Sequence, residues 1–474
     1  MPLIQNSKVL FEQDTQIKAI FCNGQMVWPT LPPPDYSEPF YVENITQNTE
    51  TLTIAKQNVN APDVTVEYSL NRLDWSTLGT TSTTPLTKPL QAHSKIYLRA
   101  NTTSWGTQGY NTFNYIRGVS KVGGNVLSLI YGSNFTGNET TFINNTNQVF
   151  RNLFDRSTTL QDAGDLILIA DLTSYCYYRM FFGCGSLTSA PELPATTLAE
   201  YCYYGMFHNC YALPIAPALP ATTLADSCYN GMFSGCTSLT TAPELPATTL
   251  ANYCYQYMFA RCTSLVNPPA LSVATLASYC YKGMFAGCTS LVNAPTLPAT
   301  TLADYCYEGM FESCTSLTTA PALPATTLAD YCYSGMFMYC TSLVNPPVLS
   351  ATVLAEYCYG TMFMYCTSLT TAPALPATTL AHICYGQMFN NCWSLTTAPE
   401  LPATTLTQSC YFGMFESCTS LNNVTCLATD ISADASTYEW LNSVSSTGTF
   451  TKAAGVTWPT GESGIPSGWT VVEV

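Results

Sequence analysis

Residues 323–348 read LPATTLADYCYSGMFMYCTSLVNPPV, and this 26-residue unit recurs along more than half of the chain. The motif LPATTLA begins at Leu193, Leu219, Leu245, Leu297, Leu323 and Leu375, and variants of it begin at Leu271, Leu349 and Leu401. Every interval is a multiple of 26 residues. A fixed period is typical of proteins in which each coil contacts only its neighbours and stacks its apolar side chains into one core. The repetition therefore predicts a solenoid.

Ten coils carry the pattern Cys-Tyr-x-x-Met-Phe-x-x-Cys-x-x-Leu, from residues 176–187 to residues 410–421. A degenerate coil precedes them, with Leu153, Phe154, Ser157 and Leu160 in the Met, Phe, Cys and Leu places. Because proline cannot donate to a ladder of hydrogen bonds, each coil has room for only a short parallel strand around Ser-Leu-Thr-Thr-Ala. The Met-Phe-x-x-Cys segment lacks β-branched residues and favours a helical or 3₁₀ turn on the opposite side.

The pattern Met-Phe-x-Gly-Cys-Thr-Ser-Leu, with the proline-containing turn after it, resembles the BspA-type leucine-rich repeats. Repeats of that family occur in gut-bacterial surface proteins and in the phages that infect those bacteria. The resemblance covers about residues 150–426 and implies a leucine-rich-repeat solenoid. Two features depart from the family pattern, namely the 26-residue length and the cysteines at places where an apolar branched residue often stands.

The residues before the repeats predict an all-β region. Residues 1–30 alternate in strand fashion around Asn23-Gly24, a strong signal for a β-hairpin, and residues 31–36 form a proline-rich linker. Residues 37–115 contain short strand signals separated by turn clusters, as in a small β-sandwich. The runs VEYSLNRLDWSTLG and KIYLRA resemble an immunoglobulin- or fibronectin-like module. Strands are expected at residues 51–54, 64–69, 75–78 and 95–100.

The ends of the repeat block need caps, because the terminal coils would otherwise expose their apolar faces. Residues 116–172 are expected to form the first cap with the degenerate coil, residues 173–426 the ten repeats, and residues 427–474 the second cap. Residues 433–444 suit a short amphipathic helix, with Trp440 and Leu441 as core contacts.

Composition excludes several classes of function. The chain has 474 residues, of which 47% are hydrophobic and 9% charged, and a formal net charge of −15. This charge has the wrong sign for phosphate backbones and anionic lipid, so neither nucleic acid nor membrane is an expected partner. No ordinary secretory signal and no stretch of about 18 consecutive apolar residues is present. We expect a protein made in the cytoplasm.

Cysteine use points to structure more than to chemistry. Twenty of the 22 cysteines form ten Cys-x₇-Cys pairs, one in each coil. Zinc sites typically use closer spacing, and disulfide frameworks belong to small secreted domains. The simplest interpretation is two ladders of buried, reduced thiols; disulfides between coils are the alternative. No catalytic motif, cofactor site or metal site stands out, and we predict that the protein is not an enzyme.

The informative positions vary while their neighbours do not. They follow the invariant Tyr or the Met-Phe pair of each coil, so their side chains are expected to point to solvent and form stripes along the stack. Met338, Tyr339, Met364 and Tyr365 are expected to meet as an exposed patch, although drift on a surface without function is an equal alternative. The candidate ligand-contact residues are Tyr178, Tyr204, His208, Asn230, Gln256, Arg261, Lys282, Glu308, Met338, Tyr339, Met364, Tyr365 and Phe412.

These features lead to a hypothesis of a structural or adhesive protein of a phage virion, in a head or tail fibre or as a decoration protein. The hairpin resembles virion-anchoring N-termini of gut phages, including crAss-like phages, and the ending GIPSGWTV resembles the ends of their repeat proteins. The resemblance implies attachment to other virion proteins through residues 1–30, with the candidate anchor Ile20, Phe21, Asn23, Gly24, Val27 and Trp28. The repeats are then expected to bind a host-surface glycan or protein from the virion surface, in a homo-oligomer for which analogy with fibres favours a trimer. A bacterial cell-surface adhesin is the alternative, and a polysaccharide depolymerase a further one.

Overall fold

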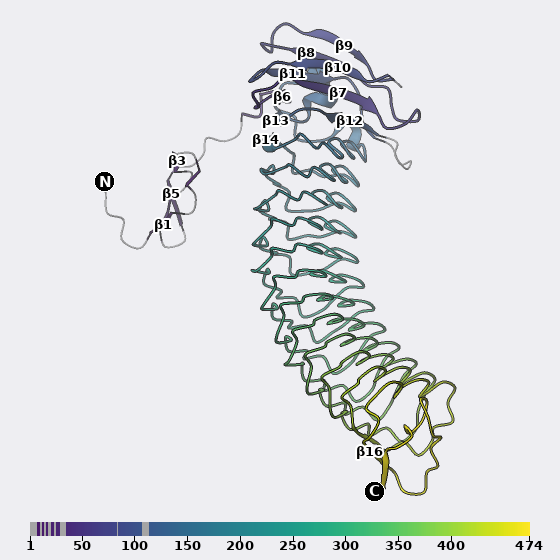
Figure 1. Ribbon diagram of the computed structural model, residues 1–474. Coiled ribbons are helices and arrows are strands. Elements are labelled where there is room, and N and C mark those ends of the chain that lie inside the picture. Colours follow the sequence, from purple (N-terminus) through teal and green to yellow (C-terminus); the bar gives the residue numbers. More distant parts are fainter. Residues whose placement is uncertain are drawn as a thin grey trace.

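The computed structural model describes residues 35–82, 84–106 and 113–474, together with the backbone of five short strands within residues 7–28. A β-rich head is followed by a curved stack of similar coils, with the C-terminus at the far end (Figure 1). Regular strands lie within residues 7–28, in the head and at the end of the stack, and α1 (Ser128–Tyr131) is the one α-helix in the described residues. Two 3₁₀ turns, η1 (Gly132–Asn134) and η2 (Ile143–Asn145), follow it.

The first strands form the predicted hairpin. Strand β4 (Ile20–Cys22) pairs antiparallel with β5 (Gln25–Trp28), and Cys22 lies opposite Gln25. Strand β1 (Ser7–Val9) adds to β4, while β2 (Glu12–Gln13) pairs with β3 (Gln16–Ile17). Of the candidate anchor, Ile20, Phe21, Val27 and Trp28 lie on these strands, and Asn23 and Gly24 lie outside the described residues.

The head contains two sheets whose buried faces belong to one core. One sheet has the strand order β14-β13-β6-β11-β8-β9 and the other β10-β7-β12. Their strands are β6 (Tyr41–Glu43), β7 (Glu50–Lys56), β8 (Thr65–Ser69), β9 (Ser76–Thr80), β10 (Leu86–Leu90), β11 (Lys95–Ala100), β12 (Asn114–Arg117), β13 (Lys121–Asn125) and β14 (Asp162–Ile167). Strands β7, β8, β9 and β11 confirm the four predicted from sequence. The immunoglobulin- or fibronectin-like identity stays a prediction.

The head runs into the stack without a break. Strand β14 pairs parallel with β13 of the head, and Asp162 at its start bridges to Ser189 of the first repeat, also in parallel. The sheet therefore crosses the boundary expected at residue 115. The alternating patterns of residues 37–115 could not indicate this, because the joining strands come from the region interpreted as a cap.

Each coil turns through a run of overlapping β-turns. In residues 201–210, alternate N–H groups donate to the carbonyl three residues back, as Tyr204 does to Tyr201. The N–H groups between them donate to the next coil, as Tyr203 does to Cys228. Tyr201, Gly205 and Asn209 all have a positive φ. A positive φ at the third residue of a turn is the mark of a type II turn and interrupts a helix, so the expected helical segment is wrong.

In place of the predicted parallel strands, the repeats are joined by isolated β-bridges. Thr241 and Asn267 form one such bridge, as do Asn293 and Thr319. A second row of bridges joins the Ala-Thr-Thr segments of some coils, for example Thr275 with Thr301. The prolines around each bridge have no N–H to donate, which keeps the pairing from extending.

Residues 435–443 form an eleventh coil in place of the predicted helix. Ala435, Glu439 and Ser443 repeat the positive-φ spacing of the other coils. The N–H of Phe415 donates to the carbonyl of Trp440, in the register that joins one repeat to the next. Trp440 thus takes the Met place and is buried, as predicted. Beyond it, β15 (Asn423–Cys426), β16 (Thr449–Lys452) and β17 (Thr470–Glu473) close the stack as a parallel sheet.

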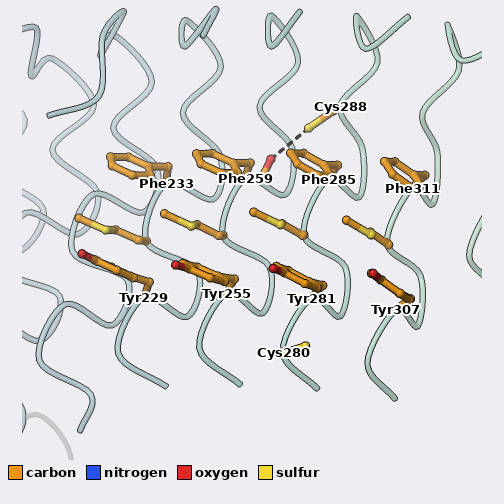
Figure 2. Close-up of a cluster of buried hydrophobic side chains, with 14 of the residues drawn as sticks. Tyr229, Phe233, Tyr255, Phe259, Cys280, Tyr281, Phe285, Cys288, Tyr307 and Phe311 are labelled. Carbon is orange, nitrogen blue, oxygen red and sulfur yellow. Dashed lines mark hydrogen bonds between the residues drawn. The ribbon is translucent and has the colours of Figure 1, made fainter. Parts of the chain in front are cut away.

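The core consists of side-chain columns, as the repeat pattern predicts. The Phe column from Phe181 to Phe415 has neighbouring ring centroids 5.4–5.9 Å apart. The Tyr column from Tyr177 to Tyr411 has spacings of 5.8–6.1 Å. Figure 2 shows part of both columns, from Phe233 to Phe311 and from Tyr229 to Tyr307. The degenerate coil joins the core through Leu153, Phe154, Ser157 and Leu160, which are all buried.

The positive-φ place before each Met gives a test of the turn geometry. Glycine occupies it in six coils, including Gly335, whereas the next coil has Thr361 there at φ 55°. A left-handed non-glycine residue costs about 1–2 kcal/mol. We expect Thr361→Gly to raise the free energy of unfolding by about 1 kcal/mol and Gly335→Ala to lower it by about 1 kcal/mol, as measured by chemical denaturation. The nearest atom to an added Cβ at Gly335 is 3.5 Å away, so crowding would not account for the loss. Equal stability of both variants and the parent would contradict the turn assignment.

Candidate functional site

The varying side chains gather on the face made by the β-turns, here called the turn face. It consists of the residue after the invariant Tyr, the residue in the usual glycine place, and the two residues after Met-Phe. Of the thirteen candidate ligand-contact residues, Arg261 and Tyr339 are exposed, Asn230 is buried and the other ten are half-buried. The side chains are therefore less open than the sequence suggested, because residues of adjacent coils cover one another.

Most aromatic candidates stack in pairs along the stack axis. Tyr178 and Tyr204 have ring centroids 4.9 Å apart, and Tyr339 and Tyr365 have centroids 4.7 Å apart. The second pair shows that the rings of Tyr339 and Tyr365 meet on adjacent coils, while the contact of Met338 with Met364 stays a prediction. Stacking closes the inner face of each ring, so a ligand can reach only edges, hydroxyl groups and the outer faces of the pairs.

A groove of about 500 Å³ lies on the turn face across the first to sixth coils. Its floor has small side chains in three successive coils, Ser234, Ala260 and Ala286, in the column where His208 and Glu312 stand on either side. The volume is in the range of small-ligand sites. The groove is lined by Arg179, Tyr204, Gly205, His208, Asn230, Gly231, Ser234, Tyr257, Ala260, Arg261, Ala286, Gly287, Glu312 and Ser313.

The groove brings together four of the candidates, Tyr204, His208, Asn230 and Arg261. The amide of Asn230 donates to the side-chain oxygen of Gln256 at 2.6 Å, so Gln256 supports the groove from beside it. Lys282 and Glu308 are not among the lining residues and pair with each other at 2.7 Å. Met338, Tyr339, Met364, Tyr365, Phe412 and Tyr178 also lie outside the lining.

Sequence reasoning missed Arg179 and Tyr257, which occupy the usual glycine place. Each lies over the glycine of the following coil, Arg179 over Gly205 and Tyr257 over Gly283. Arg261 lies over Gly287 in the same way. The signal was in the sequence as a large residue in the glycine place followed by glycine 26 residues later, but its meaning depends on the direction in which the side chains lean.

The electrostatics of the groove differ from those of the whole chain. Residues 173–426 contain only three Lys or Arg residues, Arg179, Arg261 and Lys282, against eleven Asp or Glu residues. Two of these three cations line the groove, and within the described residues neither has a carboxylate oxygen within 4.0 Å. The groove therefore holds two of the three cations of an acidic stack, beside the one carboxylate of Glu312.

The surroundings in the groove shift the pKa of two titratable groups. Burial and the positive charge of Arg179 lower the pKa of His208, which stacks on Phe182 at 4.9 Å and is neutral near pH 7. Burial, followed by the negative charge of Glu308, raises the pKa of Glu312, while Arg261 opposes that rise. His208 can thus donate or accept a hydrogen bond without adding charge.

Comparison with known families agrees with this geometry. The family model described as "BspA type Leucine rich repeat region (6 copies)" matches residues 148–284, 206–344, 252–395 and 334–453, which together cover more than half of the chain. The chain belongs to the BspA-type leucine-rich-repeat family. No curated protein and no solved structure matches the chain. The match extends past residue 426 and includes the eleventh coil.

A second surface feature of this BspA-type protein is a row of tyrosines just before the first Cys in seven of the ten coils. Tyr253, Tyr279, Tyr305, Tyr331 and Tyr357 stack with centroids 4.4–4.8 Å apart. Sequence reasoning passed over them because they are regular, and only varying positions were considered. Stacking on both sides leaves the three inner rings with only their edges and hydroxyl groups free, so this row offers no ring face to a ligand except at its ends.

Neither metal nor membrane features appear in the part of the chain that the structure describes. No group of three or more His, Cys, Asp or Glu side chains there is placed to hold a metal ion. None of the helices in the same residues has the length and apolar character needed to cross a membrane. Glu308 and Glu312 are the two carboxylates near the groove, and Glu308 is already paired with Lys282.

The cysteines of the repeats form two buried ladders. Figure 2 labels one member of each, Cys280 on the side of the Tyr column and Cys288 on the side of the Phe column. In one ladder, each thiol donates to the carbonyl of the Phe in the preceding coil, as Cys288 does to Phe259 at 3.1 Å. The same bond is made in all ten repeats, and an apolar side chain could not provide it. The cysteines from Cys176 to Cys426 are all free thiols.

We expect the repeat thiols to be unreactive toward an alkylating reagent in the native protein and reactive after unfolding. Burial prevents access and raises the pKa of Cys236 to about 12, so almost no thiolate exists at pH 8. Alkylation at pH 8 without reductant should modify nearly all repeat cysteines in denaturant and few or none in buffer, as read by mass spectrometry. A denatured protein that stays unmodified and is two hydrogens lighter per pair would show disulfides instead.

Proposed function

We propose that this protein is a non-enzymatic binding protein of a phage virion, in a fibre or decoration role, whose turn-face groove contacts a glycan or protein on the host surface. The observation that carries the binding role is the groove itself. Three successive coils have small residues where their neighbours have large ones, although the repeat-defining side chains stay unchanged beneath them. The family match supports a role in surface adhesion or binding.

The virion setting is supported by the likeness of residues 20–28 and of the ending GIPSGWTV to short segments of gut-phage proteins. In this proposal residues 1–30 attach to other virion proteins, and the head holds the stack away from the particle. The net charge of −15 keeps projecting, homo-oligomeric stacks soluble. A bacterial cell-surface adhesin is the second candidate, favoured by the family match, which is not specific to phages.

Filling the groove tests the binding role. Ala260→Met and Ala286→Met place in the floor the residue that Met338 and Met364 provide in the same column, so the coils should still fold. We expect the double variant to lose at least 90% of the binding of the full chain to host cells in a pull-down assay. Met364→Ala, outside the groove, is the matched control and should bind like the parent. Unchanged binding of the groove-filled protein would refute the groove as the contact site.

The location is tested separately on particles and cells. Mass spectrometry of purified virions should detect the full chain, and a chain without residues 1–30 should be absent from them. Recovery of the chain in the bacterial surface fraction, and not in virions, would establish the adhesin instead. Release of reducing ends from host polysaccharide by the purified chain would identify the depolymerase.

A further inference from the structure

We propose that the turn-face groove is a site for an acidic oligosaccharide, in which Arg179 and Arg261 hold carboxylate groups and Tyr257 packs on a sugar ring. This inference rests on the proposed binding function and specifies its ligand. Protein ligands, neutral glycans and acidic peptides are the alternatives that the experiment below separates.

The placement of two arginines in the groove favours an acidic ligand. Two of the three cations in ten repeats line one groove, in a stack that otherwise carries eleven scattered carboxylates. A guanidinium group binds a carboxylate through two parallel hydrogen bonds, and its strength increases where water is partly excluded. Arg179 is half-buried and packs on the rings of Phe182 and Tyr204, at 4.8 and 5.6 Å from their centroids. Its position is thus held by packing and leaves its charge for a ligand.

The distance between the two arginines also favours an extended ligand. Arg179 and Arg261 lie in the glycine place of the first coil and just after Met-Phe in the fourth coil. At roughly 4.8 Å per coil, three coils separate them by about 14 Å along the stack. A single small anion such as acetate cannot reach both, whereas an extended chain of several sugar rings with spaced carboxylates can.

The side chains that lie between the two arginines suit a sugar. No other ring stacks on Tyr257 among the described residues, in contrast to Tyr204 and Tyr339. One face of Tyr257 rests on Gly283, and space remains above Gly231, where the nearest atom to an added Cβ is 3.9 Å away. An aromatic face of this kind packs on the C–H face of a sugar ring. The side chains of His208, Asn230 and Glu312 supply hydrogen-bond donors and acceptors for hydroxyl groups.

An acidic peptide fits these observations less well. Its carboxylates would gain from the two arginines, but the backbone N–H groups of these turns are already paired within or between coils, which leaves no row of donors for strand pairing. The polar side chains are instead distributed along the whole groove, as an oligosaccharide with hydroxyl groups on every ring requires.

Isothermal titration calorimetry on the full chain tests the proposal with defined probes. These are trigalacturonate, a hyaluronan tetrasaccharide and 3′-sialyllactose, each compared with its carboxyl-reduced or desialylated neutral counterpart, and a hexaglutamate peptide. We expect at least one acidic sugar to bind at least tenfold more tightly than its neutral counterpart and than the peptide. Binding should weaken between 50 and 500 mM NaCl.

Variants matched to other coils then locate the site. Arg179→Gln introduces the residue that Gln387 provides in the same place, and Arg261→Asn introduces the residue of Asn209 and Asn391. Each should weaken the acidic sugar at least tenfold, and Tyr257→Gly should weaken it about fivefold. Arg156→Gln, outside the groove lining, should leave affinity unchanged.

The outcomes separate this inference from the proposed function. Equal affinity for neutral and acidic sugars, preference for the peptide, or no binding of any acidic sugar at millimolar concentration overturns the inference. In each case the groove-filled variant still decides whether the groove binds host cells. Loss of acidic-sugar binding in the arginine variants, with retained binding to Arg156→Gln, supports it.

Discussion

Raising the pH from 8 to 10 in the presence of reductant is expected to unfold the repeat stack. Burial raises the pKa of Cys236, Cys288 and Cys418 from 9.0 to about 12. The folded chain therefore holds these protons while the unfolded chain releases them above pH 9. A group whose pKa is higher in the folded state contributes its full stabilisation of the fold below its unfolded pKa. That stabilisation is lost as the pH rises toward the folded pKa.

The size of the effect follows from the number of thiols. At pH 10 each thiol removes about 1.4 kcal/mol, so the twenty repeat thiols together remove on the order of 25 kcal/mol. A folded domain is stable by about 5–15 kcal/mol, so unfolding is expected between pH 9 and 10. Circular dichroism during a pH titration measures the transition.

A matched variant identifies the cause. Cys236→Ala with Cys262→Ala removes two ionisable groups, so the dependence of the unfolding free energy on pH near pH 9.5 should fall by up to two protons. A stack that stays folded at pH 10.5 under reducing conditions would contradict the buried-thiol account. Resistance that disappears when reductant is added would indicate disulfides between coils.

Trp440→Ala is expected to lower the free energy of unfolding of the last coils by about 3–5 kcal/mol. Trp440 is fully buried, and its ring lies 6.0 Å from Tyr411 and 5.5 Å from Trp458. Its indole N–H donates to the carbonyl of Gly464 at 2.9 Å. Removal of the ring leaves a cavity at the end of the Tyr column and an unpaired carbonyl in the cap.

The effect should be local, because each coil contacts only its neighbours. Hydrogen exchange followed by mass spectrometry should show lost protection over about residues 405–470 and retained protection over residues 200–350. Trp440→Met, which introduces the residue of the other ten coils, should cost less. Trp393→Ala is the control, since Trp393 is 49% exposed and should change stability by under about 1 kcal/mol. Uniform loss of protection along the stack would contradict local capping.

Much of the core could be predicted because a repeat puts the same position into the same environment each time. One coil with Met336, Phe337 and Cys340 inside implies ten such coils, and all of these columns are buried. The turn geometry could not be predicted, since the positive φ recurs at residues as different as Tyr201, Gly205 and Asn209. Strand β10 was not among the predicted strands; it contains Pro89, which is tolerated there because β10 lies at the edge of its sheet.

Only some of the residues of the candidate site could be predicted from the sequence. Arg261, His208 and Asn230 were found because they vary between otherwise constant neighbours. Arg179 and Tyr257 were missed because their place is usually glycine, and the effect of replacing that glycine depends on the adjacent coil.

The sequence by itself determined the 26-residue period, the apolar columns and the buried place of the cysteines, because these depend on one coil and its copies. Tertiary structure alone decided that the head joins the stack through β14, that residues 435–443 form one more coil, and that small residues of three coils open a groove between large ones. The physical reason is that each of these features is a relation between coils, set by the direction of side chains and by backbone bonds that residues 26 positions apart make only after the chain has stacked.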